Sequence, residues 1–167
     1  MMRIHAARVA VGLLMTMAFT ACAETQVVPL AIEPRPACDF NALMAQRGTP
    51  SQPVMVPQVP STITETPLNA VNITDVSITN KVMVQSTNAR RTPTGTVEVW
   101  TRLLNCTDFP LQVEGGTHFL DAAQAPAEGV SAWNRVILPA RSFGVYHELS
   151  TSATRVTYYY VELREAR

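Results

Sequence analysis

From Leu68 to the C-terminus, apolar and polar residues alternate with a period of two, which predicts β-strands. The clearest run is 95–105, in which one face carries Val97, Val99, Thr101 and Leu103. Shorter runs recur at intervals of about 8 to 12 residues, separated by turns that contain glycine or proline. About seven short strands without a sustained helical period predict an all-β fold, an antiparallel β-sandwich of immunoglobulin-like size.

The other predicted strands follow from the same pattern. Residues 71–79 alternate as a first strand with mixed faces, and a second strand begins at Val82. Residues 87–95 contain Pro93, Gly95 and two arginines, and we expect a turn there. The pattern continues at 109–113 and 117–120, with a bulge or a tight turn expected at Gly115 and Gly116 between them. Further strands are expected at 133–138, 143–149 and 155–163. Tyr159 and one tryptophan are expected in the core.

The segment 23–67 has a different composition, because it holds eight of the twelve prolines. Proline lacks a backbone donor and disfavours helix in the preceding residue, so we expect an extended linker without a core, followed by the sandwich domain at 68–167. One short helix is expected within it, at 38–47. Asp39 would cap this helix, and Phe40, Leu43 and Met44 would share one face.

Residues 1–22 have the layout of a bacterial export signal. Basic residues precede an apolar run at 9–19, which spans only about 16 Å as a helix, too short for a membrane anchor. Residues 19–22 resemble a lipobox, in which Cys22 is acylated and attaches the mature protein to the membrane. Residues 21–23 equally fit ordinary signal peptidase, which would release a soluble periplasmic or secreted protein. With Ala23 after the cysteine, the outer membrane, facing the periplasm, is the expected location.

The cysteines and the charge balance indicate a disulfide and limit the possible partners. After export Cys38 and Cys106 remain as a pair in an oxidising compartment, so a disulfide is expected; the alternative is a buried Cys106 and a free Cys38. Thirteen basic and thirteen acidic residues leave no excess positive charge, which argues against a nucleic-acid partner.

Few residues suggest catalysis. After signal removal the chain retains His118 and His147, and it lacks the sequence motifs of hydrolases, zinc proteases and nucleotide-binding enzymes. We expect no enzyme activity, catalytic residue, cofactor or metal. The candidate binding surface consists of aromatic residues that could contact a partner or a sugar ring, although such residues more often fill a core: Trp100, Trp133, Tyr158 and Tyr160.

A family resemblance covers residues 105–164. It is carried by N-x-T at Asn105, F-L-D at 119–121, S-A-W-N-R-V-I-L-P at 131–139, Tyr146, and Y-Y-V-E-L-R at 159–164. In these motifs the chain resembles the small outer-membrane lipoproteins of the YcfL type. The resemblance implies a β-sandwich in the cell envelope and supplies no catalytic residues. The long proline-rich segment and the cysteine pair depart from that pattern.

Three functions remain in competition on these grounds. The first is a non-enzymatic envelope lipoprotein whose sandwich binds a protein partner as an accessory to an envelope assembly. The second is a periplasmic module that binds carbohydrate or peptidoglycan through its aromatic residues. The third, an envelope enzyme using His118 or His147, has the least support.

Overall fold

The computed structural model describes residues 37–48, 51–153 and 155–167. The predicted export signal, Cys22 and the first part of the proline-rich segment lie outside these residues. No helix in the described ranges is long and apolar enough to cross a membrane.

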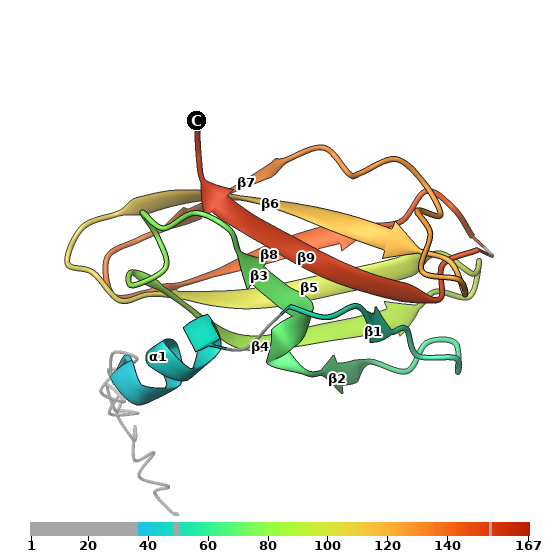
Figure 1. Ribbon diagram of the computed structural model, residues 1–167, viewed down its shortest axis with the longest axis horizontal. Helices are drawn as coiled ribbons and strands as arrows, with labels where there is room; N and C mark the ends of the chain where they lie inside the picture. The colour runs from blue at the N-terminus through green and yellow to red at the C-terminus, as the bar shows by residue number, and fades with distance from the viewer. Residues whose placement is uncertain (1–36, 49–50, 154) are drawn as a thin grey trace, which may run out of the picture. The chain divides into compact units, whose positions relative to one another are not determined.

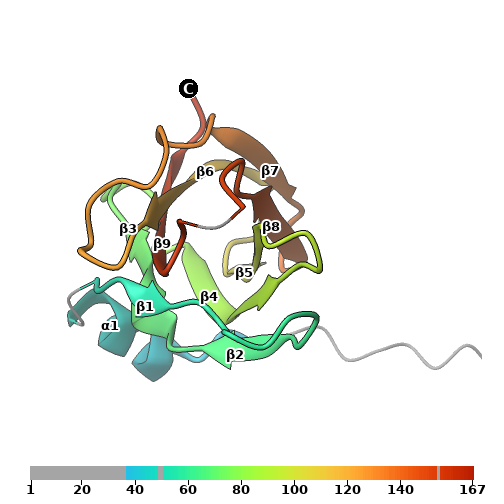
Figure 2. The ribbon, with the colours of Figure 1, turned by 90° about the vertical axis from the view of Figure 1, so that its right-hand side faces the viewer.

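Two β-sheets face each other and enclose the core (Figures 1 and 2). The first sheet has the order β1-β9-β6-β7, and β3 also pairs with β9, in parallel. Its strands are β1 (Val54–Met55), β3 (Val71–Ile73), β6 (Leu111–Leu120), β7 (Asn134–Leu138) and β9 (Tyr158–Glu165). The second sheet has the order β2-β4-β5-β8. Its strands are β2 (Thr64–Thr66), β4 (Val82–Arg91), β5 (Val97–Asn105) and β8 (Phe143–Leu149). The described chain is therefore an all-β sandwich of mostly antiparallel sheets.

The core follows the predicted alternation. Val97, Val99 and Leu103 of β5 are fully buried between the sheets, as expected. The largest buried side chains are two tyrosines whose hydroxyl groups find partners: Tyr159 lies 2.6 Å from the Thr66 hydroxyl, and Tyr146 lies 2.8 Å from that of Thr117. Burying a hydroxyl costs little when it is hydrogen-bonded, so both rings can fill the core.

The expectation of a buried tryptophan is wrong. Trp100 and Trp133 both lie on outer faces and are half-buried. Tyr146 takes the interior position instead, because Gly115 on the facing sheet leaves room for its ring.

The predicted helix is present as α1 (Phe40–Gly48). The Asp39 carboxylate accepts hydrogen bonds from the backbone N–H groups of Asn41 and Ala42, which caps the helix as expected. The expected disulfide between Cys38 and Cys106 is also present. Of the predicted apolar face only Leu43 is buried, against Met83, Leu104 and Cys106, while Phe40 and Met44 are exposed.

The second half of the predicted linker requires correction. Residues 54–55 pair with β9 as β1, and residues 64–66 pair with β4 as β2. Val56 is buried in the core, and a short 3₁₀ helix, η1 (Leu68–Ala70), follows Pro67. The folded domain thus begins well before residue 68, because these short segments cover the edges of long strands that would otherwise be open.

Two strand boundaries also differ from expectation. The strand predicted over 71–79 stops at Ile73, and Asp75 then accepts the Ser77 N–H in a tight turn. The turn predicted at 87–95 is shorter, because β4 continues through Arg91 and pairs with β5 up to Val97. The backbone reverses only across 92–96, where the Thr92 N–H donates to the Thr96 carbonyl.

Candidate binding surfaces

Each sheet has an outer face that carries aromatic and charged side chains. On the second sheet the pairing places Trp100 of β5 beside His147 of β8 and Asn88 of β4. We call the outward residues Arg90, Trp100, Arg102, Val145 and His147 the Trp100 face. On the first sheet we call His118, Trp133, Tyr160, Glu162 and Arg164 the Tyr160 face.

Trp100 occupies the centre of its face. Its ring stacks with the His147 imidazole at a centroid distance of 5.5 Å, and the Arg90 guanidinium lies 5.1 Å from the ring centroid. Because β5 pairs with neighbours on both sides, the backbone that carries Trp100 is held by two ladders. The ring is thereby positioned before any partner arrives.

Glu98 holds the charged residues of the Trp100 face in place. Its carboxylate lies 2.7 Å from the Arg90 guanidinium and 2.8 Å from His147 Nε2. Partial burial raises the pKa of Glu98, but the hydrogen bonds from His147 and Arg90 outweigh it, so the pKa is lowered overall. Glu98 therefore stays ionised and orients both side chains beside Trp100.

The Trp100 face also presents apolar surface to solvent. Val145 is 54% exposed, and Leu149 on the same strand is 46% exposed. The Arg102 guanidinium lies 3.9 Å from the centroid of the Phe143 ring, beside the end of the sheet that α1 covers. Val145 and Leu149 thus form an exposed apolar strip, with Arg102 on β5 and Arg90 on β4.

The Tyr160 face is organised around a stacked pair. The His118 and Tyr160 rings are stacked and nearly parallel, with an interplanar angle of 5° and centroids 4.3 Å apart. His118 Nε2 lies 2.9 Å from the Glu162 carboxylate. Burial, and then the negative charge of Glu162, raises the pKa of Tyr160, so its hydroxyl remains protonated at neutral pH.

Trp133 lies farther along the same face, over Gly116. A side chain at Gly116 would meet the Trp133 ring at 3.5 Å, and the Arg164 guanidinium lies 3.8 Å from the ring centroid. Arg164 also pairs with Glu114, which is shared with Arg135. The ring therefore packs the segment before β7 onto the sheet.

The structure separates the four predicted binding residues. Tyr158, Tyr160 and Trp133 belong to the first sheet or pack on it, whereas Trp100 lies on the opposite outer face. The sequence analysis did not select Arg90, Arg102 or Val145, because their proximity to Trp100 depends on strand pairing between distant segments.

The two histidines do not converge. His118 lies on the first sheet and His147 on the second, each paired with a glutamate on its own outer face. They cannot act together on one substrate. Within the described ranges no group of three or more histidine, cysteine or acidic side chains is arranged to hold a metal ion.

No protein-family model matches the chain, and a search of curated proteins finds no match. Two solved structures are similar over part of it. Campylobacter jejuni cj0090 is 18% identical, with a TM-score of 0.46 over 58% of this chain and 98% of that one. A DUF1425 family member from Shewanella sp. pv-4 is 22% identical, with a TM-score of 0.44 over 52% of this chain and 79% of that one. The function proposed below therefore rests on this chain's own residues.

Proposed function

We propose that this protein is a non-enzymatic lipoprotein of the bacterial cell envelope whose sandwich domain binds a protein partner through the Trp100 face. The observation that carries the proposal is the composition of that face. A half-buried tryptophan, two arginines and exposed aliphatic side chains lie together on paired strands. Tryptophan and arginine are the residues enriched at the energetic centres of protein interfaces.

Pre-ordered side chains favour binding, because they lose little conformational freedom when a partner docks. Glu98 fixes Arg90 and His147 beside Trp100, and Phe143 supports Arg102. On the outer face of the first sheet, Glu114 likewise pairs with Arg135 and Arg164. The Trp100 face thus combines exposed apolar side chains with arginines that are held in place.

The location in the envelope is supported by the sequence. The export signal, the lipobox ending at Cys22 and the resemblance to YcfL-type lipoproteins all favour a lipid anchor in the outer membrane. The disulfide of the structure fits an oxidising compartment. An immunoglobulin-like sandwich held by such an anchor would act as an accessory component of an envelope assembly.

A second candidate is carbohydrate or peptidoglycan binding at the Tyr160 face. One observation favours it. The half-exposed Tyr160 ring stacks on His118, and His118 in turn contacts the Glu162 carboxylate. An aromatic ring offers a stacking surface for a sugar, and a neighbouring carboxylate accepts hydrogen bonds from its hydroxyls.

A pair of matched substitutions tests the proposal and separates the two candidates. Trp100→Ala and Tyr160→Ala each remove a half-buried aromatic from one outer face. In envelopes treated with a chemical cross-linker, we expect Trp100→Ala to reduce recovery of a discrete protein adduct about tenfold or more, and Tyr160→Ala to leave it unchanged. Loss of binding to peptidoglycan fragments in Tyr160→Ala, with no protein adduct for the wild type, would instead establish the second candidate.

A further inference from the structure

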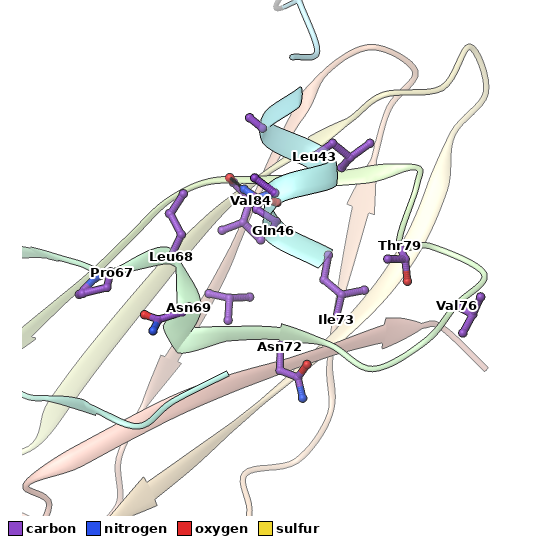
Figure 3. A pocket seen from close by; sticks show the side chains of 13 residues that line it. Leu43, Gln46, Pro67, Leu68, Asn69, Asn72, Ile73, Val76, Thr79 and Val84 are labelled. Atoms are coloured by element: carbon purple, nitrogen blue, oxygen red, sulfur yellow. Dashed lines mark hydrogen bonds between the residues drawn. The ribbon is translucent and has the colours of Figure 1, made fainter. Parts of the chain in front are cut away.

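A groove of about 680 Å³ lies between α1 and the chain that leads into β3 (Figure 3). Ala42, Ala45 and Gln46 of α1 form one wall, and η1 with β3 forms the other. The rim carries two exposed apolar side chains, Leu68 at 37% and Val76 at 82%. None of the residues that line this groove belongs to the Trp100 face or the Tyr160 face.

The lining is uncharged. The thirteen residues that line the groove include no aspartate, glutamate, lysine or arginine. The polar groups among them are amides and one hydroxyl, and the rest are aliphatic. Removing a charge from water is costly without a partner, so this lining selects an uncharged occupant.

The wall opposite α1 includes an open strand edge. All three residues of β3 line the groove, and among the described residues β3 pairs only with β9. The Thr74 N–H donates to the Leu163 carbonyl, so Asn72 also faces β9, because the backbone groups of a strand alternate in direction. The N–H and C=O of Ile73 therefore point away from β9.

The α1 wall is fixed in advance. The Cys38–Cys106 disulfide holds the start of the helix, and Leu43 packs against Met83 and Leu104. The Gln46 side chain donates to the Val84 carbonyl and accepts from the Val84 N–H. Gln46 therefore already uses the backbone groups of Val84 with which an added strand could pair. In this groove the open edge of β3 remains for an occupant.

We infer that the groove binds an extended, uncharged peptide segment of a partner protein, which adds as a strand to the open edge of β3. Main-chain hydrogen bonds to Ile73 would provide affinity, and alternate apolar side chains would contact the aliphatic lining. An acyl chain would fill the space but leave the β3 edge without hydrogen-bond partners. The observations therefore favour a peptide over a lipid.

The probe for this site is an acetylated and amidated heptapeptide of alternating threonine and valine. Titrated into the ¹⁵N-labelled disulfide-bonded protein, it should give saturable amide shifts at 71–73 and 42–46. It should also slow hydrogen exchange of the Ile73 amide about tenfold or more. The same peptide N-methylated at every residue keeps its apolar surface but lacks the residues' main-chain N–H donors that strand pairing needs, and it should not bind.

Two substitutions on one helix provide the matched control. Ala45→Trp would fill the groove and should weaken the peptide about tenfold or more. Met44 is exposed on α1 and is not among the residues that line the groove, so Met44→Trp should not change the affinity. If Ala45→Trp fails to fold, the N-methylated peptide still decides the question on the unchanged protein.

Three outcomes would overturn the inference. Equal binding of the N-methylated peptide would show that the strand edge is not used. Saturable binding of dodecanoate at the same residues, without binding of the heptapeptide, would assign the groove to an acyl chain. A dimer in sedimentation, together with slow hydrogen exchange at 71–73 in the absence of any peptide, would assign the edge to a second copy of this chain.

Discussion

Gly115 faces the Tyr146 ring in the core. A Cβ atom there would lie 2.4 Å from Cδ2 of Tyr146, whose hydroxyl is fixed by Thr117. The ring cannot withdraw without losing that hydrogen bond, so Gly115→Ala should lower the free energy of unfolding by about 1–3 kcal/mol or more. Chemical denaturation followed by circular dichroism measures the change.

The matched control is Gly129→Ala, because a Cβ there would meet no atom within 4 Å. It should change stability by less than about 0.5 kcal/mol. If the two variants were equally stable, Tyr146 would not be packed against Gly115 as described.

Glu114 makes the stability of the fold depend on pH. Hydrogen bonds from Arg135 and then Arg164 lower the pKa of Glu114 below its ordinary value. A carboxyl group whose pKa is lower in the folded state stabilises the fold above its unfolded pKa, near 4.5, and loses that contribution as the pH falls through the folded pKa. Glu114→Gln should therefore be less stable than the wild type at pH 7, and the difference should shrink below about pH 4.5.

Unfolding measured from pH 7 to pH 3 checks this expectation. As the pH is lowered, the free energy of unfolding should decrease more steeply for the wild type than for Glu114→Gln. A stability difference that stays constant over this range would show that the charge of Glu114 does not hold the two arginines.

At the scale of elements, the disulfide secures α1 to the second sheet. It joins residues separated by 68 positions, for which chain entropy gives about 4 kcal/mol of stabilisation. The double variant Cys38→Ala, Cys106→Ala should be less stable by an amount of this order. Thermal unfolding of the oxidised wild type, the reduced wild type and the variant measures it.

Reduced wild type and variant should unfold at similar temperatures, both below the oxidised protein. If reduction left the unfolding temperature unchanged, the helix would be held by Leu43 and Gln46 rather than by the covalent bond.

The elements with strong local signals could be predicted from sequence. β5 alternates cleanly over 97–103, and Asp39 is an ordinary helix cap, so both were predicted correctly. β1 and β2 have only two and three residues, too few for a visible period, and they exist because β9 and β4 provide edges to pair with. The end of β4 is polar in sequence, and pairing with β5 keeps it extended.

The candidate sites were predictable only in part. Residue type was enough to select Trp100 and Tyr160 as aromatic contacts. Their assignment to opposite faces requires the strand order, which joins β5 to β8 and β9 to β6 across long stretches of sequence. The groove requires in addition the placement of α1 beside β3, which no local pattern indicates.

One motif of the family resemblance, N-x-T at Asn105, has a structural role in this chain. The Asn105 side chain is buried and donates to the carbonyls of Phe109, Leu138 and Pro139, while its Oδ1 accepts from Thr107. It thereby ties the end of β5 to the connection after β7. The N-x-T motif consequently reports on the fold rather than on a binding site.

At the scale of the whole molecule, the proposal predicts a lipid on the mature protein. The N-terminal peptide isolated from envelopes should begin at Cys22 and carry the mass of a diacylglyceryl group and an acyl chain. A peptide beginning at Glu24 without lipid would show that the protein is released as a soluble form.

The central claim is that the protein acts by binding through the Trp100 face, and site-specific photo-cross-linking tests it most directly. A benzoylphenylalanine at Val145 would report on the Trp100 face, and one at Ile137, 65% exposed on an edge strand of the other sheet, would serve as the control. After irradiation of intact cells, we expect one discrete protein adduct from position 145, absent when Trp100 is also replaced by alanine, and none from position 137. No adduct from position 145, or the same adduct from both positions, would contradict the account.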